Sequence, residues 1–287
     1  MRRTVRLSLL CCLFFAGLSR SAFGAYQAVD DRGVVVRLRY PAVRVISLAP
    51  DLTETVFAIG AGNALVGVVR GSDFPVAASK LPRVGSYLGL DMEAIVALHP
   101  DLIVAWGDGF SRQLAILKKW GIPVYVSRPR DLQALPRLMR HLGVLLGVPL
   151  QATQAASAYS RELTQLQRRY AATRPVTVFF QLGNYSLLTV NQDSWINQML
   201  VMCGGRNIFA EARLPVPEVS MESVAALDPE VIINSSTTTA WKQRWQPLAT
   251  LRAVKQHRLY TIDPDVIERM GPRALQGVKQ LCGWLAG

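Results

Sequence analysis

Two aromatic residues lie within two residues of a glycine, at positions where a flat ligand could stack on their rings. Trp106 ends the apolar run "LIVAW" and precedes Gly-Asp-Gly, and Tyr87 lies in "GSYLGLD". A Trp or Tyr ring offers a large apolar face, which suits a large and flat ligand. These residue types therefore indicate ligand binding.

The sequence contains no pattern typical of catalysis, of nucleotide binding or of a metal centre. His99, His141 and His257 are far apart and lack the spacing of metal ligands. The stretch "GAGNAL" (60–65) lacks the third glycine of the dinucleotide fingerprint, and no phosphate-binding loop occurs. No Ser, His and acid set supports a catalytic triad. We therefore expect no enzyme activity, no cofactor and no metal site.

One phrase occurs twice, as "MEAIVALHPDLIV" at 92–104 and "MESVAALDPEVII" at 221–233, with six of 13 positions identical. In each copy a helical stretch ends before a proline, Pro100 or Pro229, and an apolar strand follows. Alternating helices and buried strands are typical of a parallel sheet with helices on its faces. The repeat therefore predicts two similar α/β lobes.

The start of each repeated helix presents equivalent polar residues. Asp91 and Ser220 occupy the N-cap positions, and Glu93 and Glu222 follow two residues later. A carboxylate there stabilises the helix by about 0.3 to 1 kcal/mol through the dipole, which alone could explain both glutamates. Helix N-termini also gather at the ligand-binding edge of such sheets. We therefore expect Glu93 and Glu222 on opposite rims of a shared cleft, where a partner could pair with both.

The same edge of the sheets is expected to hold the ligand, because open α/β sheets bind ligands beyond the carboxyl ends of their strands. Trp106 and Tyr87 should lie there on the first lobe. On the second lobe, the counterpart of Trp106 is Ser235, which opens a loop that carries Trp241 and Trp245.

The rest of the sequence predicts the first strand and helix of the N-terminal lobe and the helix that joins the lobes. The strand "VRVISL" (43–48) precedes Asp51 and Glu54 at capping-box spacing, which predicts a helix that runs to Gly60.

Residues 153–172 place apolar side chains at helical spacing, and about 20 residues form a rod of roughly 30 Å. The expected fold is α/β, with two Rossmann-like lobes around a central cleft, joined by one long helix. We divide the chain into a leader (1–24), an N-terminal lobe (25–150), a linking helix (151–174) and a C-terminal lobe (175–287).

The leader has the pattern of a cleaved secretory signal peptide. Arg2, Arg3 and Arg6 precede an apolar run over 7–18, which is shorter than the roughly 20 residues of a membrane-spanning helix. Its four arginines and lack of acidic residues mean that the net charge falls from +12 to +8 on cleavage. The remaining basic residues are scattered, which favours a solvated surface over nucleic-acid binding.

The cysteines indicate a disulfide. Cys11 and Cys12 lie in the leader, which leaves Cys203 and Cys282 as an even pair in an oxidising compartment. With no His or Cys close by in the sequence, these two thiols would make a poor metal site.

Several motifs together resemble one family. The chain is similar to the substrate-binding proteins of metal-chelate importers, which serve cobalamin, haem and ferric siderophores, and most of all to the cobalamin-binding members. The resemblance covers nearly all of the mature chain and both cysteines. It implies a soluble periplasmic protein, not an enzyme, that captures cobalamin and delivers it to an ABC permease and ATPase complex in the inner membrane. The motifs that carry it are "ISLAP", "SDFP", "IVALHPDLIVAW", "CGGRNIF", "ERMGPR" and "KQLC".

The resemblance also implies residue roles. Tyr87 and Trp106 would face the corrin ring, and Asp265 and Arg269 would contact the ligand from the second lobe. The positions of Glu93 and Glu222 match lobe-tip glutamates that meet arginines of the permease, and Cys203 and Cys282 match a family disulfide.

Three ligand-site positions depart from the family pattern. Gly71 stands in place of a tyrosine, Val216 in place of a tryptophan, and Leu188 in place of another aromatic residue. The loss of stacking surface leaves a haem or ferric-siderophore binding protein as the alternative. Haem would need a Tyr or His ligand, and Tyr87 could serve.

Overall fold

The computed structural model describes residues 26–107, 109–170 and 174–286. The predicted signal peptide, residues 1–24, lies outside the described residues. Within the described part of the chain, no helix combines the length and the apolar character that a membrane crossing requires.

The first lobe is built on a four-stranded parallel sheet with the strand order β4-β3-β7-β8. These strands are continuous apolar runs, as expected for a sheet covered on both faces. The strands are β3 (Val45–Ser47), β4 (Leu65–Val68), β7 (Leu102–Trp106) and β8 (Val124–Ser127). The helices are α1 (Pro50–Ala58), α2 (Met92–Ala97), α3 (Ser111–Lys119) and α4 (Ala134–Leu145), with 3-10 turns η1 (Gly62–Ala64) and η2 (Val76–Lys80).

Two antiparallel hairpins complete the first lobe. One hairpin pairs β1 (Tyr26–Val29) with β2 (Val35–Leu38), and the other pairs β5 (Gly85–Ser86) with β6 (Gly89–Leu90). The second hairpin leads directly into α2, so it sets where the first copy of the repeated phrase begins.

The second lobe repeats the design with a four-stranded parallel sheet of order β10-β9-β11-β12. Its strands are β9 (Val176–Leu182), β10 (Gly205–Asn207), β11 (Val231–Ser235) and β12 (Leu259–Ile262). Its helices are α6 (Trp195–Met202), α7 (Met221–Leu227), α8 (Arg252–Lys255), α9 (Pro264–Ile267) and α10 (Ala274–Ala286), with the 3-10 turn η3 (Ala240–Trp245). The two sheets confirm the predicted pair of α/β lobes.

The two copies of the repeated phrase fold alike. In α2, Asp91 accepts a hydrogen bond from the Ala94 N–H at 2.9 Å, and in α7, Ser220 accepts one from the Ser223 N–H at 3.1 Å. Both predicted N-caps are therefore confirmed.

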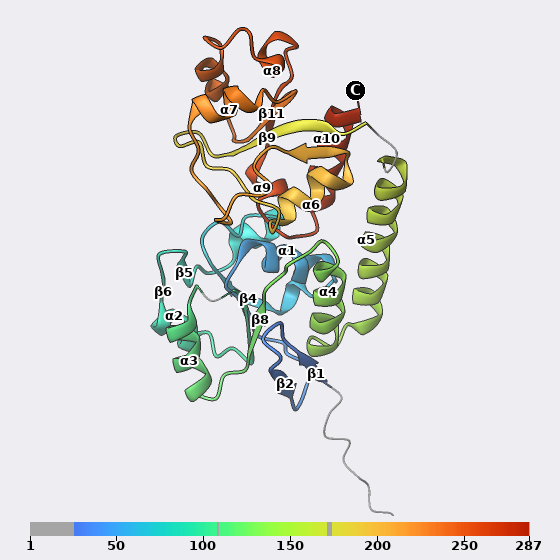
Figure 1. The fold of residues 1–287 in the computed structure, drawn as a ribbon. Coiled ribbons are helices and arrows are strands. Elements are labelled where there is room, and N and C mark those ends of the chain that lie inside the picture. The colour runs from blue at the N-terminus through green and yellow to red at the C-terminus, as the bar shows by residue number, and fades with distance from the viewer. Residues whose placement is uncertain (1–25, 108, 171–173, 287) are drawn as a thin grey trace, which may run out of the picture.

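The linking helix α5 (Pro149–Tyr170) runs along one side of both lobes (Figure 1). Its 22 residues span about 33 Å at the usual helical rise. It packs against α4 of the first lobe and α10 of the second. Its buried face is formed by Ala152, Ala156, Tyr159, Leu163 and Leu166.

One hydrophobic core extends through both lobes and α5. In β7, Leu102 and Val104 belong to this shared core, while Ile103 and Ala105 face a separate cluster under α2 and α3. The alternation follows from the period-2 geometry of a strand. Because the core is continuous through α5, the lobes are packed as one body around their cleft.

The capping box predicted at the first helix is wrong. The N-cap of α1 is Ala49, with Pro50 in the first turn and no side-chain cap. Asp51 and Glu54 are instead buried, and Glu54 pairs with a side chain of the second lobe, Arg273. A distant partner therefore overrides the local capping pattern.

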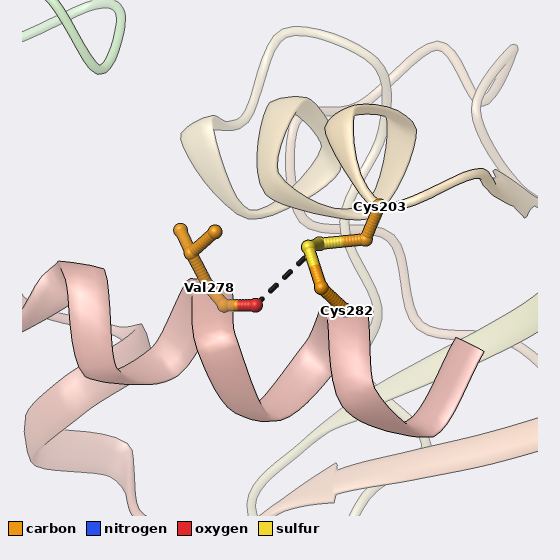
Figure 2. Close-up of a disulfide and its surroundings, with 3 residues drawn as sticks. All are labelled: Cys203, Val278 and Cys282. Atoms are coloured by element: carbon orange, nitrogen blue, oxygen red, sulfur yellow. Dashed lines mark hydrogen bonds between the residues drawn. A yellow bond between two sulfur atoms is a disulfide. The ribbon is translucent and has the colours of Figure 1, made fainter. Parts of the chain in front are cut away.

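The predicted disulfide between Cys203 and Cys282 is confirmed. It joins the C-cap of α6 to α10, with the two Cα atoms 4.5 Å apart, and both residues are fully buried (Figure 2). The carbonyl oxygen of Val278 lies 3.5 Å from the Cys203 sulfur, as a close contact because a bridged sulfur carries no proton. The two cysteines are 79 residues apart in sequence, so the bond closes a long loop within the second lobe.

Candidate ligand-binding cleft

A cavity of about 860 Å³ lies between the two lobes. The first lobe contributes Trp106, Pro129 and Arg130, and the second lobe contributes the segment around the start of α6 together with Val216 and Glu268. We call it the interlobe cavity. Its volume is within the range of small-molecule sites.

The interlobe cavity lies at the carboxyl ends of the strands, as the sequence predicted. Trp106 is the last residue of β7, Leu182 is the last residue of β9, and Pro129 follows β8. Parallel strands bring these ends to one edge of each sheet. The two sheets therefore supply their ligand-binding edges to one shared space.

Trp106 is exposed because its strand extends beyond the core. The four preceding residues of β7 are buried, whereas Trp106 is 42% exposed. The next residue, Gly107, has a positive φ of 59°, which turns the chain at the mouth of the cavity. Its ring is thus an apolar surface open to a ligand.

Polar groups also line the interlobe cavity and connect its walls. The Gln198 amide of α6 donates to the carbonyl oxygen of Arg130 at 2.9 Å, across the lobes. Within the second lobe, the Ser235 hydroxyl donates to the carboxylate of Glu268, a lining residue. The charged side chains on the lining are Arg130, Asp193 and Glu268.

A group of ion pairs joins the lobes elsewhere along their interface. Glu54 of α1 is 3% exposed and accepts from Arg273 through both oxygens, at 2.9 and 2.7 Å. The hydrogen bond that Arg273 donates to Glu54 raises the pKa of Arg273. Such bidentate pairs fix geometry as well as charge. We call Glu54, Asp265, Arg269 and Arg273 the interlobe charge cluster.

Arg269 extends the interlobe charge cluster. Its guanidinium lies 2.6 Å from the Asp265 carboxylate, 3.6 Å from Glu54 and 3.7 Å from Asp73. The Arg273 guanidinium also stacks over the Phe74 ring, 4.4 Å from its centroid. Both arginines therefore draw first-lobe groups toward the second lobe.

Asp51 is a buried carboxyl at the same interface. Burial raises its pKa to about 7, against the smaller opposing effect of backbone hydrogen bonds. A side chain at Gly271 of the second lobe would contact it, with a Cβ 3.5 Å from the Asp51 Cα. The protonation of Asp51 thus changes near neutral pH, at the point where the lobes meet.

The structure brings only some of the predicted ligand residues to the interlobe cavity. Trp106 and Val216 line it. Tyr87 lies in the turn between β5 and β6 and is 88% exposed, and Gly71 follows β4 with a positive φ of 87°. Leu188 bridges to Leu182, a lining residue.

Asp265 and Arg269, predicted to contact ligand, belong to the interlobe charge cluster and are not among the described residues that line the interlobe cavity. Their partners in this structure are protein side chains on both lobes.

The loop that follows Ser235 does not bring Trp241 and Trp245 to the interlobe cavity. Both are buried in the outer core of the second lobe. The Trp245 ring meets Phe179 edge-on, with centroids 5.7 Å apart, and the Trp241 N–H donates to the Thr261 hydroxyl at 3.0 Å. The 3-10 turn η3 folds this stretch back onto the sheet, so their rings serve packing.

Sequence reasoning missed Trp195, which lines the interlobe cavity from the first position of α6. The available signal was its place after Ser194, whose side chain accepts from the Ile196 N–H at 3.2 Å. A serine N-cap marks a helix start in the connection that follows β9. That connection begins at the ligand-binding edge.

Glu93 and Glu222 are exposed in the first turns of α2 and α7. A hydrogen bond with its own backbone amide, and then one with the Ser220 hydroxyl, lower the pKa of Glu222. Neither glutamate lines the interlobe cavity within the described residues. No group of His, Cys, Asp and Glu side chains in this part of the chain is arranged to hold a metal ion.

The chain belongs to the periplasmic binding protein family, whose model matches residues 45–266. This family consists of substrate-binding transport proteins.

Relatives with specific names extend the match. A vitamin B12-binding protein of Vibrio cholerae is 36% identical over 248 residues, which cover 86% of this chain and 90% of that protein. The crystal structure of a periplasmic vitamin B12-binding protein of Vibrio cholerae superposes with a TM-score of 0.80 at 36% identity, covering 85% of this chain and 97% of that one. A periplasmic haem-binding protein from Pseudomonas aeruginosa gives a TM-score of 0.76 at 28% identity, covering 85% and 93%.

Proposed function

We propose that this protein captures cobalamin between its two lobes and delivers it to an ABC permease and ATPase complex in the inner membrane. The observation that carries the proposal is the interlobe cavity, with Trp106 at the carboxyl end of β7. The 36% identity to vitamin B12-binding proteins supports the choice of ligand.

The chemistry of the interlobe cavity favours a ligand that combines a flat apolar ring with neutral polar groups. Trp106 offers a ring face, while Arg130, Asp193 and Glu268 offer hydrogen bonds at the lining. Two carboxylates against one guanidinium suit carboxamide side chains, such as those of cobalamin, better than the two carboxylates of haem.

Haem is the second candidate, because haem-binding proteins are among the structural neighbours. Tyr87 is the residue that would ligate the iron. It would have to move toward the cavity from the exposed β5–β6 turn.

The remaining site roles are part of the proposal. Tyr87 would close over the corrin ring, and Asp265 and Arg269 would reach the ligand by exchanging a contact within the interlobe charge cluster. Gly71, Leu188 and Val216 would leave space where related proteins carry aromatic rings.

The proposed location is the periplasm, with residues 1–24 as the signal peptide. The buried disulfide supports an oxidising compartment. In this setting Glu93 and Glu222, exposed on α2 and α7, would seat arginines of the permease. We retain the division into lobes at 25–150 and 175–287, with the linking helix at 151–174, as part of the proposal.

Calorimetric titration of the exported protein with cyanocobalamin, cobinamide and haemin tests the ligand. We expect one cobalamin per chain and much weaker haemin binding. Tight haemin binding without corrinoid binding would replace the proposal by its haem alternative. Turnover of any of these ligands would contradict a pure binding role.

A further inference from the structure

Trp195 begins α6 and lines the interlobe cavity from the second lobe, whereas Trp106 lines it from the first. The helix start is fixed by Ser194, whose hydroxyl accepts from the Ile196 N–H. The backbone that carries Trp195 is therefore set before any ligand arrives.

The ring of Trp195 is also held in place. Its indole N–H donates to the carbonyl oxygen of Ile267 at 3.0 Å, and Ile267, in α9, is fully buried. The side chain packs against the core shared by both lobes. Because the one polar group of the indole is already bonded, the part of the ring at the cavity offers carbon to a ligand. A fixed ring loses little side-chain entropy on binding.

Trp195 lines the same cavity wall as Val216, where the family resemblance predicts an aromatic side chain that this chain lacks. Val216 lines the same cavity and is 49% exposed, but its side chain is too small to stack on a macrocycle. Leu188 is attached by bridges to Leu182 and Glu218. Among the described residues that line the second-lobe wall, Trp195 is the aromatic one.

We propose that Trp195 determines specificity by providing the second-lobe ring against which a flat macrocycle stacks, opposite Trp106. This inference rests on the proposed capture of cobalamin. Two rings on different lobes select for a planar ligand, because a ligand without a flat face cannot cover both.

The test compares three variants by titration with cyanocobalamin. Trp195→Leu removes the ring and should weaken binding about tenfold, which corresponds to about 1.4 kcal/mol. Trp195→Phe keeps a ring but loses the hydrogen bond to Ile267, and it should stay within about threefold of the unsubstituted protein. Trp120→Leu is the matched control, because Trp120 is 55% exposed at the end of α3 and lies outside the cavity lining. Its affinity should not change.

The outcomes separate stacking from a structural role. If Trp195→Phe binds as weakly as Trp195→Leu, the hydrogen bond to Ile267 matters and the stacking role is overturned. Unchanged affinity in Trp195→Leu overturns it as well. If the melting temperature shows that Trp195→Leu does not fold, Trp195→Met, whose unbranched side chain adapts to an irregular site and has no ring, takes its place. A protein that binds no corrinoid before substitution fails the proposed function itself, and the inference falls with it.

Discussion

Two parts of the interface between the lobes are built from opposite chemistry. In the interlobe charge cluster, Glu54 is 3% exposed and meets Arg273 through two hydrogen bonds. In the interlobe cavity, Trp106 is 42% exposed and its ring meets no partner ring in the described part of the chain. Paired buried charges resist separation, because each would be left without its partner. Open aromatic faces gain stability when they are covered. The cluster therefore sets the spacing of the lobes, and the cavity keeps apolar surface for a ligand.

The largest effect on stability is expected from reduction of the disulfide, which lies in neither the interlobe charge cluster nor the interlobe cavity. Reduction of Cys203–Cys282 opens a link between residues 79 apart and should cost roughly 4 kcal/mol of stability on the chain-entropy model, less any strain. The melting temperature should fall, while cobalamin affinity measured below the transition stays the same. Mass spectrometry after alkylation without reductant should find neither thiol labelled in the exported protein.

A change within the interlobe charge cluster comes next. Arg273→Ala leaves Glu54 without its bidentate partner and should lower the free energy of unfolding by about 3 kcal/mol. This is the low end for a buried pair, because Arg269 remains 3.6 Å from Glu54. Urea unfolding measures the loss.

The matched control for that variant is Arg137→Ala. Arg137 makes an exposed pair with Asp31 at 3.4 Å, so its loss should cost less than about 1 kcal/mol. Equal losses in both variants would mean that the cluster holds the lobes no better than a surface pair.

Trp106→Ala changes the other part of the interface. Loss of its ring should weaken cobalamin binding by about 1 to 3 kcal/mol, through lost apolar burial and stacking, with little change in melting temperature. Calorimetry on the same samples gives both numbers. Unchanged affinity would remove Trp106 from the site.

A pH-dependent effect, measured as a slope of stability against pH, is expected from Asp51. Because its pKa in the folded protein is raised from 3.8 to about 7, the folded state holds a proton that the unfolded state has released between those values. Stability should therefore fall as pH rises from about 4 to about 7, by up to about 1.4 kcal/mol per pH unit from this group. Asp51→Asn, which stays neutral, should remove that slope in unfolding titrations. A slope that persists in the variant would assign it to other groups.

The smallest effect on ligand affinity is expected at the outer rims. Changing both Glu93 and Glu222 to Arg should leave cobalamin affinity and melting temperature nearly unchanged, because both carboxylates are exposed outside the cavity lining. Permease binding and import should be lost through repulsion of arginines. Transport that survives in this double variant would reduce the repeated phrase to two well-capped helices.

Local sequence patterns were sufficient to predict helix caps, strand ends and helices, because these depend on interactions between residues close in sequence. The caps at Asp91 and Ser220, the strand that ends at Trp106 and the helix that carries Leu163 each depend on neighbours within a few residues. The edge at which the strands end then followed from parallel topology.

The parts that the sequence could not reveal depend on contacts between the lobes. Glu54 has the spacing of a capping residue, but its partner Arg273 is 219 residues away. The cap at Ser194 marks Trp195 as the start of a helix at the ligand-binding edge, but only the docking of the two sheets shows that it lines the cavity. Residue type alone could not tell which of Trp195, Trp241 and Trp245 are buried and which lines the cavity. The turn η3 and the start of α6 decide this.

The continuity of α5 with both cores has a consequence for how an importer would recognise cargo. Because the lobes share one core along α5, we expect α2 and α7, which carry Glu93 and Glu222, to keep their spacing when the cleft is filled. We expect the empty protein to compete with the loaded one for the transporter, which inhibition of uptake by added empty protein would measure. The transporter would then distinguish the empty protein from the loaded one only after docking, when the cleft is opened.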